Sequence, residues 1–251
     1  MRDSLFQSLY DIFSEYIQQE KDRKMIEDAY NYAKEKHQGQ LRRSGEPYIT
    51  HPVAVAIILA QLGSGPATLS AALLHDVVED TDATFEDLTR LFNADISSLV
   101  DGVTKLSKLA FTTEPSQADN HQKMLLAMAK DIRVILIKIA DRLHNIRTLS
   151  SMSPSSQVRI AQETLEIYAP IAHKLGLFII KAELEDRSLK YTEPEKYYEV
   201  SSLIQSKKDE REKNIDNIIV DIDKLFEENN LNSFEIKGRI KNIFSIYKKM
   251  Y

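Results

Sequence analysis

Apolar residues recur every three or four positions along most of this chain, a spacing that places them on one face of an α-helix. In the first segment the apolar positions with this spacing are Leu5, Leu9, Ile12, Phe13 and Tyr16. The pattern predicts helices over about residues 3–19 and 22–36, with further helices downstream. We therefore expect an all-α helical bundle.

Glycine and proline divide the expected helices. The stretch from Gly39 to Pro47 predicts a loop, and a second break, Gly63–Pro66, separates a helix that begins near Thr50 from the next one. Residues 111–120 are polar and lack apolar periodicity, so we expect a mobile loop there, which is a candidate for a lid.

The segment 131–141 is rich in β-branched residues and could be a strand. A helix is the better interpretation, because it places Asp141, Asn145 and Thr148 on one face at positions i, i+4 and i+7. Helices are then expected over about residues 155–191 and from Pro194 to about Glu228.

The pattern changes near the C-terminus. Residues 229–233 are turn-like, residues 234–238 predict a short strand, and a basic helix is expected over 240–251. A lone strand and helix cannot form a stable core of their own. We therefore expect one domain over residues 1–192, a helical connector over 193–230, and a truncated α/β stub over 231–251.

Composition narrows the classes of protein. The chain has 251 residues, of which 43% are hydrophobic, enough for a real core, and its net charge of −5 argues against broad binding of DNA or RNA. It has no cysteine, so His and carboxylates are the only plausible metal ligands, and this fits a reducing cytoplasm. No signal peptide or membrane span is evident, so we expect a soluble, cytoplasmic protein.

The strongest chemical signal is the hexad His75-Asp76-Val77-Val78-Glu79-Asp80, which lies in an apolar stretch expected to be helical. A helix that buries four ionisable side chains has no packing reason to do so, whereas a metal ion and an activated water would supply one. The expected ligands are His51, His75, Asp76 and Asp141. Such a set suits manganese, iron or zinc.

The other histidines have weaker signals. His37 is expected at a helix end, with a surface or capping role, and His121 and His173 are expected to be structural. His144 lies three residues after Asp141 and could support a ligand without binding the ion.

The basic segment Arg42-Arg43-Ser44-Gly45 lies shortly before His51. Taken alone, it could be a solvated loop. Beside a metal site, two guanidinium groups are well suited to binding phosphates. Tyr48 could stack on a base, although a tyrosine in such a loop is more often a packing residue.

Several segments, in this order, resemble the hydrolase half of RelA/SpoT-type alarmone enzymes. They are Arg42–Pro52, His75–Thr81, Asp101–Lys105, Lys138–Leu149 and Glu166–Gly176. Residues 238–250 resemble the start of that family's synthetase domain, with Ile240 where the family usually has proline. The resemblance covers essentially the whole chain.

The resemblance implies an all-helical HD fold over residues 1–192. It also implies manganese-dependent hydrolysis of the 3′-pyrophosphate of guanosine tetra- and pentaphosphate, a reaction of the stringent response that yields pyrophosphate and GDP or GTP. By matching motif, the manganese ligands are His51, His75, Asp76 and Asp141, and the residues that act on the attacking water are Glu79 and Asp80. The residues implied to contact the nucleotide are Arg42, Arg43, Ser44, Tyr48, Asn145 and Thr148.

Some members of this family have lost the hexad, and here it is intact, so we expect an active hydrolase. The resemblance further implies that the parent protein has C-terminal synthetase and regulatory domains that are missing here. We therefore expect no alarmone synthesis by this chain.

Two other functions remain open. One is a hydrolase with the same metal core that acts on deoxynucleotides or cyclic nucleotides, which Arg42, Arg43, Asn145 and Thr148 disfavour. The other is a non-catalytic module that binds nucleotide only to regulate another domain, which the intact Glu79-Asp80 pair disfavours.

Overall fold

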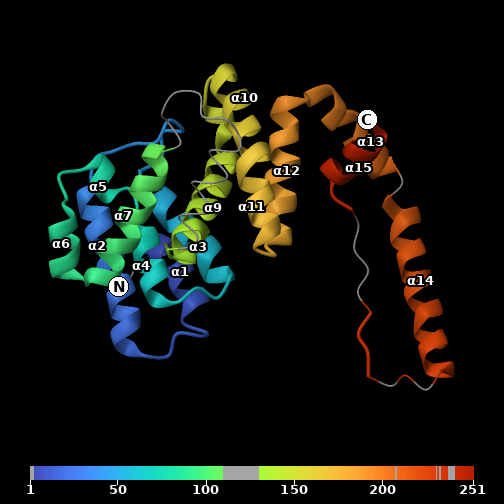
Figure 1. Cartoon of the computed structure of the whole chain (residues 1–251), viewed down its shortest axis with the longest axis horizontal. Coiled ribbons are helices and arrows are strands. Elements are labelled where there is room, and N and C mark those ends of the chain that lie inside the picture. The colour runs from blue at the N-terminus through green and yellow to red at the C-terminus, as the bar shows by residue number, and fades with distance from the viewer. Residues whose placement is uncertain (1–2, 110–129, 207, 230, 232, 237–240) are drawn as a thin grey trace.

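The computed structural model describes residues 3–109, 130–206, 208–229, 231, 233–236 and 241–251 (Figure 1). Its elements are α1 (Ser4–Phe13), α2 (Glu20–Lys36), α3 (Thr50–Gln61), α4 (Pro66–Leu74), α5 (Val77–Asp80), α6 (Phe85–Leu91), α7 (Ala94–Leu109), α9 (Ile132–Arg147), η1 (Leu149–Ser151), α10 (Pro154–Glu163), η2 (Thr164–Tyr168), α11 (Ala169–Lys174), α12 (Phe178–Thr192), α13 (Pro194–Ser206), α14 (Lys208–Glu228) and α15 (Ile243–Met250). The described residues contain no β-strand, only an isolated bridge between Leu41 and Pro47. The all-α prediction is confirmed.

Helices α1–α7 gather at one end of the molecule and α13–α15 at the other, with α9–α12 between them (Figure 1). Helices α3 and α4 form the centre of the first group, where α3 packs against α1, α4 and α9. Both are largely apolar around their circumference, and most of their residues are buried. A polar side chain on α3 therefore has to find its partners inside the protein.

At the start of several helices, a side chain accepts a hydrogen bond from a backbone N–H group that has no carbonyl partner within the helix. Thr84 and Asp87 form a reciprocal capping box at the start of α6, and Asp131 accepts from the backbone N–H of Arg133 at the start of α9. The helical interpretation of residues 131–141 is confirmed, because α9 runs unbroken from Ile132 to Arg147.

Helix α7 approaches α9 closely at Gly102. A Cβ atom added to Gly102 would lie 2.8 Å from Cγ2 of Val134, closer than real Cβ atoms come. Glycine at this position therefore lets α7 support the helix that carries Asp141.

The hexad is not one helix, contrary to the sequence prediction. Helix α4 ends at Leu74, His75 and Asp76 form a turn, and α5 begins at Val77. The proposed lid at residues 111–120 lies outside the described residues.

The C-terminal elements pack differently from the prediction. Residues 234–236 form no strand, so the prediction of a strand in the α/β stub is wrong for these residues. The rest of the expected strand lies outside the described residues. Helix α15 packs against α12 and α13. The Asp186 carboxylate on α12 accepts hydrogen bonds from the backbone N–H groups of Ile243 and Phe244 at 3.2 and 2.8 Å. This contact holds the start of α15 on α12.

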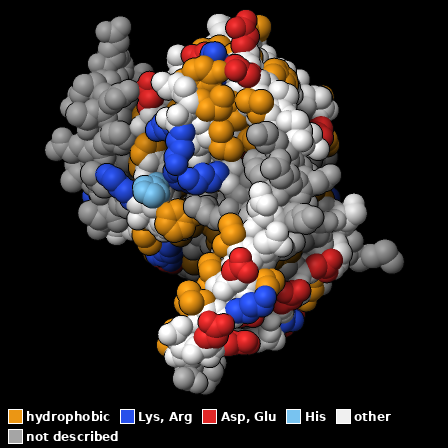
Figure 2. Space-filling view, turned by 90° about the vertical axis from the view of Figure 1, so that its right-hand side faces the viewer, with side chains coloured by type: hydrophobic (Ala, Val, Ile, Leu, Met, Phe, Trp, Pro, Cys, Tyr) orange, Lys and Arg blue, Asp and Glu red, His pale blue; other side chains and the backbone are white. Residues whose placement is uncertain are grey.

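Figure 2 views the molecule from the end that carries α13–α15 and shows apolar side chains exposed between acidic and basic groups. Exposed apolar residues on these elements include Tyr198, Leu203, Ile218 and Leu225. Within the described part of the chain, no helix combines the length and apolar character needed to cross a bilayer.

Candidate active site

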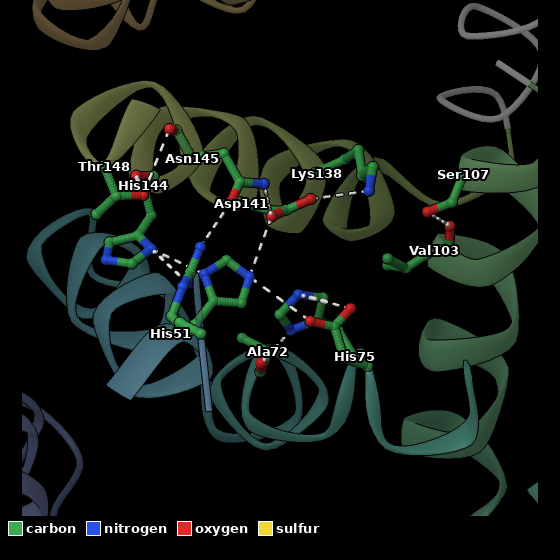
Figure 3. A network of polar contacts seen from close by, with 12 residues as sticks. His51, Ala72, His75, Val103, Ser107, Lys138, Asp141, His144, Asn145 and Thr148 are labelled. Carbon is green, nitrogen blue, oxygen red and sulfur yellow. Dashed lines mark hydrogen bonds and ion pairs between the residues drawn. The ribbon is translucent and has the colours of Figure 1, made fainter. Parts of the chain in front are cut away.

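Three separate parts of the fold bring ionisable side chains to one buried point (Figure 3). His51 comes from the first turn of α3, His75 and Asp76 from the turn between α4 and α5, and Asp141 from the middle of α9. His51, His75 and Asp141 are each less than 10% exposed. We call these four residues the inner cluster.

The side chains of the inner cluster lie close enough to share a ligand. One potential ligand atom from each of His51, His75 and Asp141 lies within 4.8 Å of the other two. Asp76 adjoins both imidazoles: its Oδ1 is 3.2 Å from His75 Nε2, and its Oδ2 is 3.6 Å from His51 Nε2. His51 Nε2 is also 3.2 Å from Asp141 Oδ1. The structure thus brings together all four residues predicted as metal ligands.

The donor set fits a divalent metal ion. His75 Nδ1 lies 2.8 Å from the Ala72 carbonyl oxygen, which can only accept, so Nδ1 carries the proton of a neutral ring. In the neutral ring, the form that binds a cation, His75 Nε2 offers a lone pair; this buried atom faces Asp76 Oδ1 at 3.2 Å but makes no hydrogen bond in the described structure. Bare imidazole nitrogens facing carboxylates repel them unless a positive charge lies between.

The pKa values of the inner cluster also show that its carboxylates favour a positive charge close to them. Burial by itself would lower the pKa of His75, but the Asp76 carboxylate raises it to about 9. Burial would raise the pKa of Asp76, yet His75 and His51 hold it below its usual range. For His51, burial outweighs the attraction of Asp141 and lowers the pKa.

Asp141 is held in place by three neighbours. Lys138 Nζ donates to its Oδ2 at 2.8 Å, and Asn145 Nδ2 donates to its Oδ1 at 2.6 Å, the atom that also faces His51 (Figure 3). Burial would raise the pKa of Asp141, but Lys138 and His51 hold it well below its usual value. Asp141 is therefore an anion with a fixed orientation.

Glu79 and Asp80 lie on α5 at the rim of the cluster, and both are exposed. The expectation that the hexad buries four ionisable side chains is therefore wrong, because the turn at His75 and Asp76 carries the next two carboxylates outward. Partial withdrawal from water raises the pKa of Glu79, and nearby Asp76 adds to this, while Thr104 and Lys138 oppose it. Glu79 is accordingly more basic than an ordinary glutamate.

A cavity of about 380 Å³ opens beside the cluster and shares Asp141 with it. Most residues predicted to contact the nucleotide line this cavity, namely Arg42, Arg43, Tyr48, Asn145 and Thr148. Ser44 is not among the lining residues, and its hydroxyl instead donates to Glu46 Oε2 at 3.4 Å.

A tight turn presents Arg42 to the cavity. The backbone N–H of Arg42 donates to the Glu46 carbonyl at 2.8 Å, and Gly45 closes the turn with a φ of +88°, which favours glycine. The Arg42 side chain reaches α9, where Nη2 donates to Asn145 Oδ1 at 3.2 Å and Nη1 lies 3.3 Å from His144 Nδ1.

Tyr48 and His37 pack together near the rim. Their rings stack with centroids 4.5 Å apart, and the Tyr48 hydroxyl lies 2.7 Å from Asp76 Oδ2 and 2.8 Å from Asp80 Oδ2. His37 follows the last residue of α2, as expected for a capping position, but it is buried beneath Tyr48 and has no surface role. Tyr48 thus joins the cluster to its rim.

Sequence reasoning missed or underweighted several polar residues around the site. Lys138 and His144 lie three residues before and after Asp141, so the helical spacing that selected Asn145 could have found them. His144 Nδ1 lies 2.8 Å from His51 Nδ1, and burial, together with the charges of His51 and Arg42, lowers the pKa of His144 to about 3.

Arg142 lines the cavity, pairs with Glu163 at 2.7 Å, and lies over the Tyr168 ring. The contact with Tyr168 joins α9 to the π-helix η2. No local pattern in the sequence could have revealed these pairings. Of the histidines expected to be structural, His173 lies exposed on α11 beside Phe178, and His121 is outside the described residues.

Comparison with known proteins gives consistent matches. Residues 29–178 match a family described as HD domain. A GTP pyrophosphokinase of Myxococcus xanthus is 50% identical over 90% of this chain and 30% of that protein. The bifunctional (p)ppGpp synthase/hydrolase SpoT of Escherichia coli (strain K12) is 46% identical over 98% of this chain and 35% of that protein.

A further relative, from Synechocystis, is named probable guanosine-3′,5′-bis(diphosphate) 3′-pyrophosphohydrolase. It is 49% identical over 88% of this chain and 29% of that protein. The chain therefore spans about a third of the length of these curated relatives. The matched HD segment contains every residue of the inner cluster and every residue named above as lining the cavity.

Proposed function

Because this chain belongs to the HD domain family, we propose that it is a metal-dependent pyrophosphohydrolase that removes the 3′-pyrophosphate from guanosine tetra- and pentaphosphate. The products are pyrophosphate and GDP or GTP, and the reaction serves the stringent response in the cytoplasm. The relatives named for this hydrolysis or for the bifunctional enzyme support the choice of substrate.

One observation carries the proposal: the inner cluster shares Asp141 with a cavity that is lined by several arginines, among them Arg42 and Arg43. A cation at this site neutralises the phosphate that reacts, and the neighbouring guanidinium groups neutralise the remaining charge of a polyphosphate substrate. A purely structural metal site does not need the arginines, and a simple nucleotide-binding module does not need the metal ligands.

Manganese is the proposed ion, with His51, His75, Asp76 and Asp141 as its ligands, because mixed imidazole and carboxylate donors suit it. When bound, it supplies Lewis-acid polarisation of a phosphate oxygen. The residues around the ligands set their protonation states and orientations in advance, through contacts such as Lys138 with Asp141.

The chain's own side chains divide the remaining work. Glu79, exposed at the rim and raised in pKa, orients the attacking water and takes its proton, while Asp80 helps to place that water. Arg42 and Arg43 bind the phosphates and stabilise the negative charge that develops on them as water attacks phosphorus and the bond to the ribose 3′ oxygen breaks; that oxygen leaves and takes up a proton. Tyr48, Asn145 and Thr148 contact the nucleoside, and Ser44 joins them if its loop shifts on binding.

We further propose that residues 1–192 form the hydrolase domain, that 193–230 connect it onward, and that residues 231–251 begin a synthetase domain. This chain is then expected to hydrolyse the alarmone without making it. In support, the described part of residues 231–251 contains one short helix, α15, which packs on α12 and α13. Incubation with ATP, GDP and magnesium tests this point, and alarmone above a protein-free control would contradict it.

The central test is pyrophosphate release from guanosine tetraphosphate by the purified chain, with manganese, magnesium, zinc or a chelator present. We expect turnover with manganese and none after exhaustive chelation. A panel of deoxynucleotides and cyclic nucleotides serves as the comparison. Faster turnover of any of these substrates, or full activity in the chelator, would refute the proposal.

A further inference from the structure

The two imidazole rings of His51 and His144 face one another through the same kind of atom. Their Nδ1 atoms are 2.8 Å apart, a hydrogen-bond distance, so one nitrogen must carry a proton and the other must not (Figure 3). The distance alone does not say which ring donates. The answer decides which nitrogen of His51 is left with a lone pair.

Arg42 settles the direction. Its Nη1 lies 3.3 Å from the same His144 Nδ1, and a guanidinium group has donors but no acceptor. A proton on His144 Nδ1 would face an N–H group of Arg42, whereas a bare His144 Nδ1 can accept from both Arg42 and His51. His144 Nδ1 is therefore the acceptor, and His51 Nδ1 is the donor.

The second path from Arg42 to the cluster agrees with this assignment. Arg42 Nη2 donates to Asn145 Oδ1, so the other end of that amide, Nδ2, is free to donate to Asp141 Oδ1. Both paths thus begin at a donor of Arg42 and end at His51 or Asp141. These hydrogen bonds leave one possible protonation of Nδ1 for His144 and one possible orientation of the amide for Asn145.

We propose that His144 is a positioning residue, which accepts the hydrogen bond of His51 Nδ1 and thereby holds His51 as the tautomer whose Nε2 lone pair faces Asp141 and Asp76. This inference rests on the proposed function only in requiring that the inner cluster binds a divalent ion. His144 is not one of the proposed metal ligands, and it is not among the residues that line the cavity. Its effect on the site passes entirely through His51.

The geometry around His51 explains why this help is needed. His51 Nε2 is 3.2 Å from Asp141 Oδ1 and 3.6 Å from Asp76 Oδ2. In the absence of His144, a proton on Nε2 would bond to these carboxylates, and that tautomer cannot bind a cation. Loss of a partner that orients a ligating histidine typically weakens metal affinity by about 10–100-fold.

The test compares two substitutions that differ in one property. His144→Phe keeps a ring but removes the acceptor, whereas His144→Asn places a carbonyl oxygen near the position of Nδ1. His173→Phe, at an exposed histidine on α11, is the matched control for the loss of an imidazole. Manganese affinity is measured by the electron paramagnetic resonance signal of the free ion, with no nucleotide present.

We expect His144→Phe to weaken manganese binding by about 10–100-fold, His144→Asn to remain within a few-fold of the unmodified chain, and His173→Phe to be unchanged. Nitrogen-15 NMR of the zinc-loaded protein gives an independent readout. The Nδ1–H signal of His51, assigned with His51→Gln, should be protected from solvent exchange in the unmodified chain and in His144→Asn, but not in His144→Phe.

Unchanged manganese affinity in folded His144→Phe would overturn the inference, as would His144→Asn behaving like His144→Phe. If His144→Phe does not fold, His144→Asn decides alone: retained affinity and a protected His51 proton support the inference, and their loss refutes it. These measurements use no alarmone. A failure to hydrolyse guanosine tetraphosphate would therefore count against the proposed function and leave this result standing.

Discussion

The inner cluster and the rim of the site differ in how firmly the fold holds them. His51, His75 and Asp141 are buried, and each has a neighbour that fixes its orientation. Glu79, Asp80 and Arg43 are exposed. A buried donor set can be organised before the ion arrives, whereas groups that meet water and substrate must remain accessible. Ion binding and turnover should therefore be separable by substitution.

The largest effect should come from breaking the inner cluster. Asp76→Ala removes a carboxylate that adjoins both imidazoles, so we expect bound metal and turnover to fall together to background. Elemental analysis and pyrophosphate release measure the two. Asp82→Ala, which removes an exposed carboxylate close by in the sequence, should leave both intact. Retained metal in Asp76→Ala would show that Asp76 is not a ligand.

A substitution at the rim should separate the two properties. Glu79→Gln keeps the size of the side chain and removes its charge, so turnover should fall by about 10²–10⁴-fold while metal stays bound. The exposed Glu86→Gln on α6 is the control. Loss of metal in Glu79→Gln, by elemental analysis, would move Glu79 into the inner cluster.

Substitutions of Arg42 and Arg43, which both line the cavity, should differ in their effects. Arg43 is exposed and should act only on substrate, so Arg43→Ala should raise KM by roughly tenfold or more without changing manganese affinity. Arg42 also contacts His144 and Asn145, so Arg42→Ala should additionally weaken manganese binding. Steady-state kinetics and metal titration distinguish them. Equal manganese affinities in Arg42→Ala and Arg43→Ala would show that Arg42 does not support the metal site.

The smallest effect should come from the packing beneath the cluster. Gly102→Ala sets a methyl group against Val134, so overpacking outweighs the helix propensity gained, with a net loss of unfolding free energy of about 1 kcal/mol. Urea unfolding measures this loss. Gly65→Ala has open space around its Cβ and should change stability little. Equal stability of the two variants would mean that α7 and α9 can separate at no cost.

The sequence revealed the site most clearly where one helix or one short segment supplied the signal. Asp141 and Asn145 share a face of α9, so helical periodicity placed them together correctly. The pairing of His51 with His144 joins residues 93 positions apart, so no local pattern could show it. The position of His37 at the end of α2 follows from the sequence, but its burial depends on Tyr48 from the following loop and could not be predicted locally.

The two wrong structural predictions also have physical causes. A strand at residues 234–236 would need a neighbouring strand for its hydrogen bonds, and the described residues provide none. The hexad has the composition of a helix. The contacts of Asp76 with His75, His51 and Tyr48 exist only in the folded chain, so composition alone could not place a turn there.

The turn at His75 and Asp76 makes this part of the chain sensitive to changes in length. Consecutive side chains of a continuous helix point about 100° apart, yet His75 Nε2 and Asp76 Oδ1 meet at 3.2 Å. Inserting a single residue after Leu74 would rotate α5 relative to α4 and send one of the two side chains elsewhere. Conservative replacements around this junction should be tolerated far better than any insertion or deletion within it.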